Sequence, residues 1–317
     1  MNAYLGLDVG AVSTNLAVID AGHRLVLRSY LRTEGDPISS VRRILAEAAG
    51  GAGGMAIAGC GTTGSGRHLA AALAGADVVR NEITSHTTAA LHYFPEARTV
   101  IEIGGQDSKI IMVENGVAVD FAMNTVCAAG TGSFLDYQAA RMGITVSELA
   151  ALASSAAESV QISGRCGVFA ETDILEKQQR GAPRGAILRG LCESLARNFL
   201  SGVAKGKTIV PPVVFQGGVA GNPAVVRAFE REIGTAVQVP EHYDVMGAIG
   251  VALLALAEGP AGGASRFKGF DVAGGDLASE VFECTGCSNR CDVIEILAGG
   301  ALISRWGGRC GKWDLAA

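Results

Sequence analysis

Aromatic residues and positive charge are both scarce in this sequence of 317 residues. Only 5% of the residues are aromatic, and 26 basic residues against 31 acidic ones give a net charge of −5 without a basic block. This balance argues against nucleic-acid binding as the main task, because nucleic-acid-binding surfaces are basic. No apolar run reaches the roughly 18 residues of a membrane span, so no membrane association is expected.

The first residues, "MNAYLGLDVG", also lack the charged n-region and apolar h-region of a signal peptide. We therefore expect a cytoplasmic protein. Its eight cysteines are then predicted to be reduced thiols, and the clustered ones to bind metal rather than form disulfides.

Glycine is abundant instead, with 44 residues spread along the chain and no period. Such glycines are typical of strand-to-helix turns and close backbone approaches. Apolar residues, 49% of the chain, suffice for a large core or two lobes. Alternating strands and helices predict an α/β architecture, with helices at residues 36–49, 64–74, 82–92, 130–141, 183–205, 222–233 and 244–257.

One strand–turn–strand pattern occurs twice. The first copy is "LGLDVGAVSTNLAVIDAGHRLV" and the second is "IEIGGQDSKIIMVENGVAVD". Aligning Gly10 with Gly104 places Asp8 on Glu102 without a gap. A repeated pattern indicates one structural unit used twice, so two lobes would each present a glycine hairpin.

These hairpins suit a nucleotide phosphate, because glycines let backbone N–H groups approach anionic oxygens. Asp8 is a candidate Mg²⁺ ligand, directly or through water. Gln106 and Asp107 are candidates to orient a water molecule or the metal. The alternative is that Asp8 and Gln106 only form turns.

A third glycine cluster, "VVFQGGVAGNP", places Gly217 and Gly218 between an apolar strand and a helix that starts near Asn222–Pro223. This edge would pack against a flat adenosine. The loop "CGTTGSGR" lacks the Lys-Ser/Thr ending of a Walker motif and is interpreted as a turn before a helix.

In this order, "GLDVGAVSTN", "EIGGQDSK" and "FQGGVAGNP" resemble the actin–hexokinase–Hsp70 type of ATPase. The stretches "MNTVCAAGTGSFLD" and "SGRCGVFAETDI" are similar to activators of 2-hydroxyacyl-CoA dehydratases and their relatives in benzoyl-CoA reductase systems. The resemblance covers about residues 3–257. It implies a two-lobed actin-like ATPase with ribonuclease H-like duplicated domains. Residues 1–96 plus 245–257 would form the first lobe, 97–244 the second, and 258–317 a linker and Cys-rich extension.

The resemblance also implies a function. Members of that family are homodimers that share one 4Fe–4S cluster, and the motifs assign its ligands here to Cys127 and Cys166. They hydrolyse ATP and pass an electron from a low-potential ferredoxin- or flavodoxin-type donor to an iron–sulfur dehydratase or reductase acting on acyl-CoA. The implied residues for ATP/ADP and Mg²⁺ are Asp8, Gly10, Ser13, Thr14, Gly104, Gly105, Gln106, Lys109, Gly217 and Gly218, with Gln106 and Asp107 catalytic. Family members often have Asp where Glu102 stands, which weakens the case for a direct metal role of Glu102.

A thiol before a helix suits a cluster, because the helix N-terminus offers unpaired N–H groups and positive potential to thiolate sulfurs. Two cysteines per chain are too few for a cluster, and a two-fold dimer would supply four. A buried structural thiol is the alternative for each. Cys60 and Cys192 are interpreted as small buried residues.

The C-terminal segment "FECTGCSNRCDVIEILAGG" has Cys284, Cys287 and Cys291 in C-x2-C-x3-C spacing, and Cys310 follows. This group predicts a second metal site, either an iron–sulfur cluster or Zn²⁺. The segment looks like the start of longer tails in fused relatives.

Two rival functions remain open from the sequence. One is a small-molecule kinase of the same fold, such as an amino-sugar kinase, which would need neither Cys127 nor Cys166. The other is a non-enzymatic assembly protein of the actin type, which would polymerise with nucleotide.

Overall fold

The computed structural model describes residues 2–52, 54–124, 128–271, 277–313 and 315. The chain divides into two compact units, Met1–Ala89 with Gly247–Ala317, and Ala90–Met246. We call them unit 1 and unit 2. Among the described helices, none combines the length and apolar character needed to cross a bilayer.

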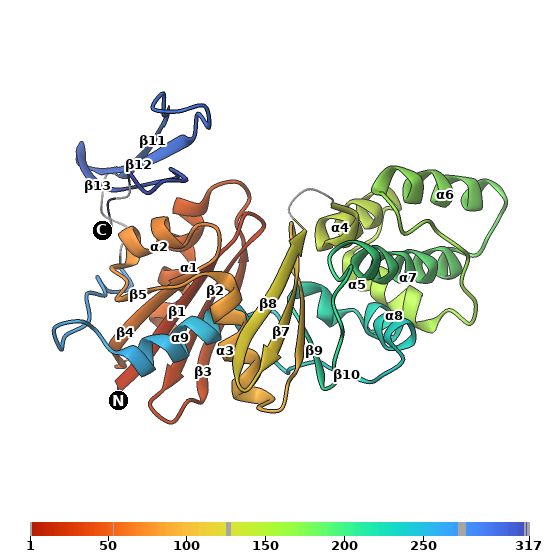
Figure 1. Ribbon diagram of the computed structural model, residues 1–317, viewed down its shortest axis with the longest axis horizontal. Helices are drawn as coiled ribbons and strands as arrows, with labels where there is room; N and C mark the ends of the chain where they lie inside the picture. Colours follow the sequence, from red (N-terminus) through yellow and green to blue (C-terminus); the bar gives the residue numbers. More distant parts are fainter. Residues whose placement is uncertain (1, 53, 125–127, 272–276, 314, 316–317) are drawn as a thin grey trace. The chain divides into compact units, whose positions relative to one another are not determined.

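Unit 1 is built on a five-stranded sheet in the order β3-β2-β1-β4-β5 (Figure 1). Its strands are β1 (Asn2–Val9), β2 (Ser13–Asp20), β3 (Leu25–Arg32), β4 (Ala56–Thr63) and β5 (Val78–Val79). Helices α1 (Pro37–Gly51) and α2 (Arg67–Ala74) contribute to the core on one face. Helix α9 (Met246–Glu258) approaches the sheet so closely that a Cβ on Gly6 would clash with the Ala248 carbonyl oxygen.

Unit 2 repeats this topology in the order β8-β7-β6-β9-β10. The strands are β6 (Thr99–Ile103), β7 (Ser108–Glu114), β8 (Val117–Asn124), β9 (Val213–Gln216) and β10 (Val237–Gln238). The helices are α4 (Gly132–Arg141), α5 (Val146–Ser155), α6 (Gly167–Gln179), α7 (Arg184–Gly202) and α8 (Pro223–Ile233), with 3₁₀ turns η1 (Ala128–Gly130) and η2 (Gly218–Gly221). Helix α3 (Glu82–Tyr93) spans the sequence boundary between the units.

The strand registers confirm the predicted repeat. Asp8 is opposite Asn15 in β2, and Glu102 is opposite Lys109 in β7, as the Gly10–Gly104 alignment requires. The turns also match: Gly10 N–H donates to Ser13 O at 2.9 Å, and Gly104 N–H donates to Asp107 O at 3.0 Å. The duplication therefore extends to individual hydrogen bonds.

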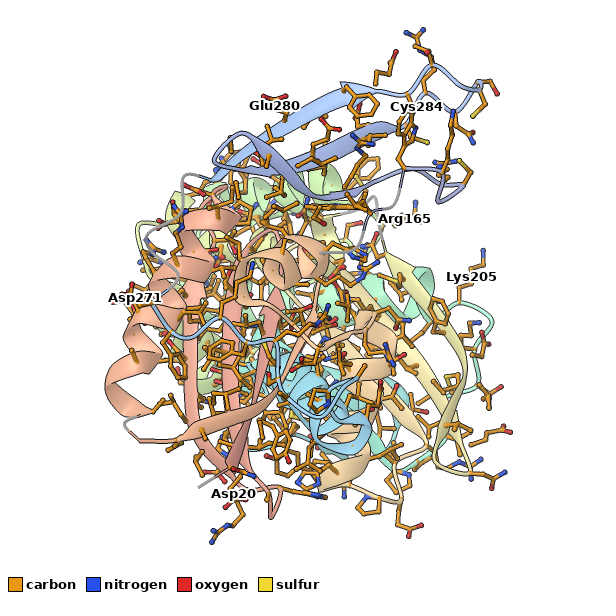
Figure 2. All side chains as sticks on the ribbon, turned by 90° about the vertical axis from the view of Figure 1, so that its left-hand side faces the viewer. Asp20, Arg165, Lys205, Asp271, Glu280 and Cys284 are labelled. Atoms are coloured by element: carbon orange, nitrogen blue, oxygen red, sulfur yellow. The ribbon has the colours of Figure 1, made fainter. Side chains whose placement is uncertain are left out.

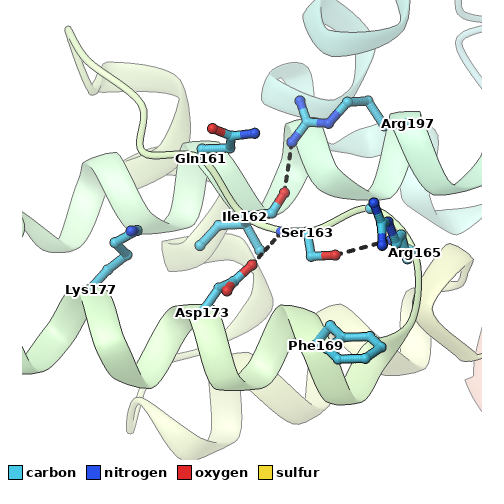
Figure 3. Close-up of a pocket in the computed structure, with 9 residues that line it drawn as sticks. Gln161, Ile162, Ser163, Arg165, Phe169, Asp173, Lys177 and Arg197 are labelled. Atoms are coloured by element: carbon cyan, nitrogen blue, oxygen red, sulfur yellow. Dashed lines mark hydrogen bonds between the residues drawn. The ribbon is translucent and has the colours of Figure 1, made fainter.

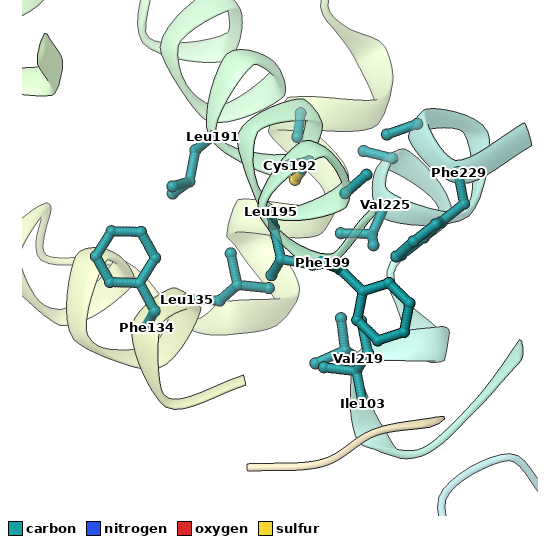
Figure 4. Close-up of a cluster of buried hydrophobic side chains, with 14 of the residues drawn as sticks. Ile103, Phe134, Leu135, Leu191, Cys192, Leu195, Phe199, Val219, Val225 and Phe229 are labelled. Carbon is teal, nitrogen blue, oxygen red and sulfur yellow. The ribbon is translucent and has the colours of Figure 1, made fainter. Parts of the chain in front are cut away.

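Alternation along the central strands separates the core face from the polar face. Ile101 and Ile103 point into the core of unit 2, where Phe199, Phe215 and Phe229 pack edge to face (the cluster around Phe199 is drawn in Figure 4). Glu102, between them, points to the opposite face. Leu7 and Val9 flank Asp8 in the same way in unit 1.

The C-terminal extension belongs to unit 1. It forms a three-stranded antiparallel sheet of β11 (Leu277–Glu283), β12 (Asp292–Ala298) and β13 (Ala301–Trp306). Ile296 is fully buried in the core of unit 1, and Trp306 stacks on His68 of α2 at 6.0 Å. The small sheet therefore shares a core with the larger one.

The segment before this sheet, expected to be a linker, is fastened to unit 1. Buried Asp77 accepts hydrogen bonds from Ser265 Oγ at 2.6 Å and from Arg266 N–H at 2.8 Å. Lys268 N–H donates to Ala74 O at 2.9 Å. The glycine-rich composition of this segment gave no indication of these hydrogen bonds.

All seven predicted helices are confirmed, with ends that differ by at most three residues. Two helices were missed, α5 and α6. Helix α5 carried a readable signal, because Thr145 and Glu148 form a capping box in which each side chain binds the other residue's backbone N–H.

Candidate functional site

An acidic residue stands near the end of the central strand in each sheet, beside a glycine with positive φ. In unit 1 a Cβ on Gly64 (φ 92°) would lie 2.7 Å from Asp8 Oδ1. In unit 2 a Cβ on Gly217 (φ 88°) would lie 2.7 Å from Glu102 Oε1. Both places require glycine, because a side chain would be strained and would strike the carboxylate. The loop "CGTTGSGR" is thus the counterpart of the predicted adenosine element, as well as a turn before α2.

The two acidic residues differ in their strand neighbours. Asp8 is opposite Asn15 in β2 and Thr63 in β4, which are both neutral. Asn15 Oδ1 and Thr63 Oγ1 are buried, and neither atom has a hydrogen-bond partner among the described residues. Gly247, near the start of α9, is so close to Asp8 Oδ2 that a Cβ there would overlap it. The carboxylate of Asp8 therefore lies close to the positive end of a helix dipole.

Glu102 instead faces a buried cation. Lys109, with 2% of its side chain exposed, donates to Glu102 Oε2 at 2.9 Å and to Asp107 Oδ1 at 2.8 Å. One ammonium thus neutralises a buried carboxylate and holds the end of the hairpin turn. Removing it would leave Glu102, which is 4% exposed, as a buried charge without this compensation.

The other predicted nucleotide-binding residues differ in their exposure to solvent. Gln106 and Gly218 are exposed, and Gly10, Ser13, Gly104, Gly105 and Asp107 are half-buried. Thr14 is fully buried, and its hydroxyl forms hydrogen bonds with Thr33 at 3.0 Å and Ser40 at 2.8 Å. Any role of Thr14 in nucleotide binding is therefore indirect, through the shape of the first hairpin.

The second hairpin is joined to the segment that follows Cys127. Gly132 N–H, at the start of α4, donates to Gly104 O at 2.9 Å, and Ser133 N–H donates to Gly105 O at 2.8 Å. Cys127 itself lies outside the described residues. The chain that follows it, Ala128–Gly130, leads directly into these bonds.

Cys166, half-buried, is the N-cap residue of α6. A Cβ on Gly167 would lie 3.8 Å from Ala129 Cβ, so the residue after Cys166 approaches the turn after Cys127. Asn198 of α7 reaches both segments. Its Nδ2 donates to Gly164 O at 2.9 Å and Arg165 O at 3.2 Å, and its Oδ1 would lie 2.9 Å from a Cβ on Gly130. The sequence did not single out Asn198.

Helices α6 and α7 hold the rest of the loop before Cys166 (Figure 3). Arg197 donates to Ile162 O at 2.9 Å, and Asp173 Oδ2 accepts from Ser163 N–H at 2.7 Å. Ser194 Oγ also donates to Ser163 O at 2.6 Å. The backbone leading to Cys166 is therefore fixed by side chains, although it has no regular secondary structure.

The prediction that Cys60 and Cys192 are small buried residues is confirmed. Both are fully buried, and burial raises the pKa of Cys192 to about 12. The Cys192 sulfur accepts a weak hydrogen bond from Asn222 Nδ2 at 3.6 Å. Burial likewise raises the pKa of Cys60 far above its ordinary value.

The C-terminal thiols lie on loops of the small sheet, where Figure 2 labels Cys284. Cys284 N–H donates to Cys291 O at 2.8 Å, and Cys284 Sγ accepts from Trp313 Nε1–H at 3.1 Å. The Trp313 bond, the Gly286 N–H and the charge of Lys312 lower the pKa of Cys284. Among the described residues, no group of three or more His, Cys, Asp or Glu side chains is close enough together to hold a metal ion.

A family model matches residues 5–255, and its description is BadF/BadG/BcrA/BcrD ATPase family. The chain belongs to this family. It is 36% identical over 260 residues to the (R)-2-hydroxyglutaryl-CoA dehydratase activating ATPase of Acidaminococcus fermentans. The aligned region covers 80% of this chain and 98% of that protein. The crystal structure of that dehydratase component A has a TM-score of 0.76 at 35% identity, over 81% of this chain and 99% of the other.

The activator of 2-hydroxyisocaproyl-CoA dehydratase from Clostridium difficile, solved with bound ADPNP, gives a TM-score of 0.75 at 34% identity, over 81% of this chain and 95% of that chain. A ROK family glucokinase from Streptomyces griseus gives 0.52 at 15% identity, over 80% and 99%, and shows the fold alone. The protein therefore has the actin-like ATPase fold and is an ATPase of the BadF/BadG/BcrA/BcrD family.

Proposed function

We propose that this ATPase is an electron-transfer activator. Two copies would share one 4Fe–4S cluster through Cys127 and Cys166 of each, and ATP hydrolysis would drive a low-potential electron into a partner iron–sulfur enzyme. Two relatives carry the names of 2-hydroxyacyl-CoA dehydratase activators. The partner proposed here is accordingly a dehydratase or a benzoyl-CoA reductase-like enzyme that acts on acyl-CoA.

The observation that carries the proposal is the approach of the two cysteine-bearing segments. Asn198 reaches both of them, and the Gly167 backbone lies against Ala129. The donors fit the group, because Cys166 is the N-cap residue of a 13-residue helix without a side-chain hydrogen bond there, and Gly167 beside it leaves room for amides near a sulfur. When bound there, the cluster would supply one-electron chemistry at low potential.

The nucleotide is proposed to act through the hairpins. Asp8 would hold Mg²⁺, directly or through water, since carboxylates are preferred ligands of this ion, whereas Lys109 neutralises Glu102. Gly10, Ser13, Gly104 and Gly105 would surround the phosphates, with Gln106 and Asp107 orienting the attacking water. Gly217 and Gly218 would border the adenosine.

A route from nucleotide to cluster follows from the same geometry. Any displacement of the Gly104–Gly105 backbone acts on Gly132 and Ser133, and hence on the turn after Cys127. Hydrogen bonding at the sulfurs tunes a cluster potential, and 59 mV corresponds to about 1.4 kcal/mol for one electron. A small shift of this turn would therefore change the driving force.

Anaerobic purification with iron and sulfide counting tests the proposal. We expect a brown, oxygen-sensitive dimer with ATPase activity, and a Cys166→Ser variant that has lost about four irons per two chains, those of the shared cluster. Cys60→Ala, which removes a buried thiol remote in sequence from the motifs, is the matched control and should keep its iron. A colourless protein, or a Cys166→Ser variant that retains the cluster, would contradict it. A kinase would be colourless, and an actin-type assembly protein would polymerise with nucleotide.

The C-terminal thiols, Cys284, Cys287, Cys291 and Cys310, are proposed as a separate site for an iron–sulfur cluster or Zn²⁺. The Gly286 N–H, 3.5 Å from Cys284 Sγ, supports it, because such bonds stabilise thiolate ligands. Metal analysis of a Cys284→Ser, Cys287→Ser double variant should show loss of metal beyond the shared cluster. An unchanged metal content would refute it.

A further inference from the structure

A pocket of about 480 Å³ in unit 2 has the opposite charge to the protein as a whole (Figure 3). Its charged lining residues are Arg165, Lys177 and Arg197, with a single acid, Asp173. The chain carries a net charge of −5, so a basic pocket is not expected from composition. One of its lining residues, Arg165, immediately precedes Cys166 in the chain.

Two of these charges are used inside the fold. Asp173 accepts the Ser163 N–H at 2.7 Å, and Arg197 donates to Ile162 O at 2.9 Å. Arg197 Nη1 also lies 3.7 Å from Glu232. The loop and the helices around the pocket are therefore held in place by their own polar contacts.

The other two charges remain available. The guanidinium of Arg165, an exposed residue, has no hydrogen-bond or ion-pair partner among the described residues. Lys177 lies 4.0 Å from Glu176, which Arg180 binds more closely at 2.7 Å. Both cations can therefore pair with an anionic ligand without losing a close contact within the fold.

The pocket adjoins exposed apolar side chains. Val168 and Phe169, in the first turn of α6, are 70% and 59% exposed. Arginine next to an aromatic residue on a rigid surface is typical of protein–protein interfaces, and pre-organisation lowers the entropy lost on binding. The open, mostly polar pocket thus suits a protein surface.

We propose that this pocket, formed around Arg165 and Lys177 beside Cys166, docks an acidic segment of the protein that donates the electron. The inference rests on the proposed function and adds to it the charge and position of the donor contact. A mobile carrier must find this site repeatedly by diffusion, and local positive charge raises the association rate of an acidic partner. Elsewhere the negative charge of the protein would repel that partner.

Titration calorimetry with an oxidised, acidic bacterial ferredoxin tests the inference, since binding then requires no electron transfer. At about 50 mM salt we expect an Arg165→Glu, Lys177→Glu variant to bind about tenfold more weakly, with the difference falling to about twofold at 500 mM because salt screens charges. Arg180→Glu is the control for a charge reversal outside the pocket, because it reverses one cation at the exposed end of α6 but does not line the pocket. It should leave the Kd unchanged.

The inference would be overturned if the double variant bound ferredoxin as tightly as the unaltered protein, or if Arg180→Glu weakened binding as much as the double variant does. Loss of dimerisation in the double variant would also overturn it. So would binding of inorganic pyrophosphate that depends on the pocket, if ferredoxin does not bind. Failure of the proposed function is a separate result. It would appear as a protein without iron, whatever the ferredoxin affinity. Reduction by methyl viologen radical, a small cation, should not be slowed in the double variant.

Discussion

Replacing Asn198 by alanine removes the side chain that reaches both cysteine-bearing segments. It deletes two hydrogen bonds, from Nδ2 to Gly164 O at 2.9 Å and to Arg165 O at 3.2 Å. Each such bond contributes about 1 kcal/mol net. The loop before Cys166 should therefore open more easily by about 2 kcal/mol, which raises its open fraction about 30-fold.

Hydrogen exchange measures this opening directly. Amides of residues 162–170 should exchange about 30-fold faster in Asn198→Ala, and iron should be lost faster to a chelator under anaerobic conditions. Ser201→Ala is the control on the same helix, because its hydroxyl bonds only to the α7 carbonyls of Arg197 and Asn198. Unchanged exchange in 162–170, or equal acceleration throughout unit 2, would refute the reasoning.

Three further outcomes are expected. Gly217→Ala should weaken nucleotide binding and lower the free energy of unfolding by more than about 1 kcal/mol. Gly234→Ala is its control, because Gly234 also has a positive φ but has open space where a Cβ would lie, so it measures the backbone strain alone. Equal losses of unfolding free energy in urea for the two variants would contradict this prediction. Lys109→Met should destabilise the protein by about 3–5 kcal/mol in the same assay, because a buried carboxylate loses its cation, and a loss below about 1 kcal/mol would oppose it. Trp313→Phe should raise the pKa of Cys284, so the metal-free thiol should be alkylated more slowly at neutral pH, where less thiolate is present. An unchanged alkylation rate would argue against that hydrogen bond.

The sequence predicted the repeated hairpins correctly because their pairing is local. Turn chemistry and period-2 alternation fix the register within about 20 residues, so the Gly10–Gly104 alignment carried over to hydrogen bonds. Helix α5 was predictable from its capping box but was overlooked. Helix α6 gave a weaker signal, because only Ala170 and Ile174 of its 13 residues are buried.

The sequence alone determined the family, the duplicated strand order and the positions of the candidate ligands, since these depend on residue type and short spacing. Only the tertiary structure revealed that Lys109 neutralises Glu102 while the strand partners of Asp8 are neutral. Only the fold placed Asn198 between the two cysteine segments, which are separated by more than 30 residues of chain. The physical reason is that long-range contacts depend on which helix faces pack together, and local patterns do not encode that packing.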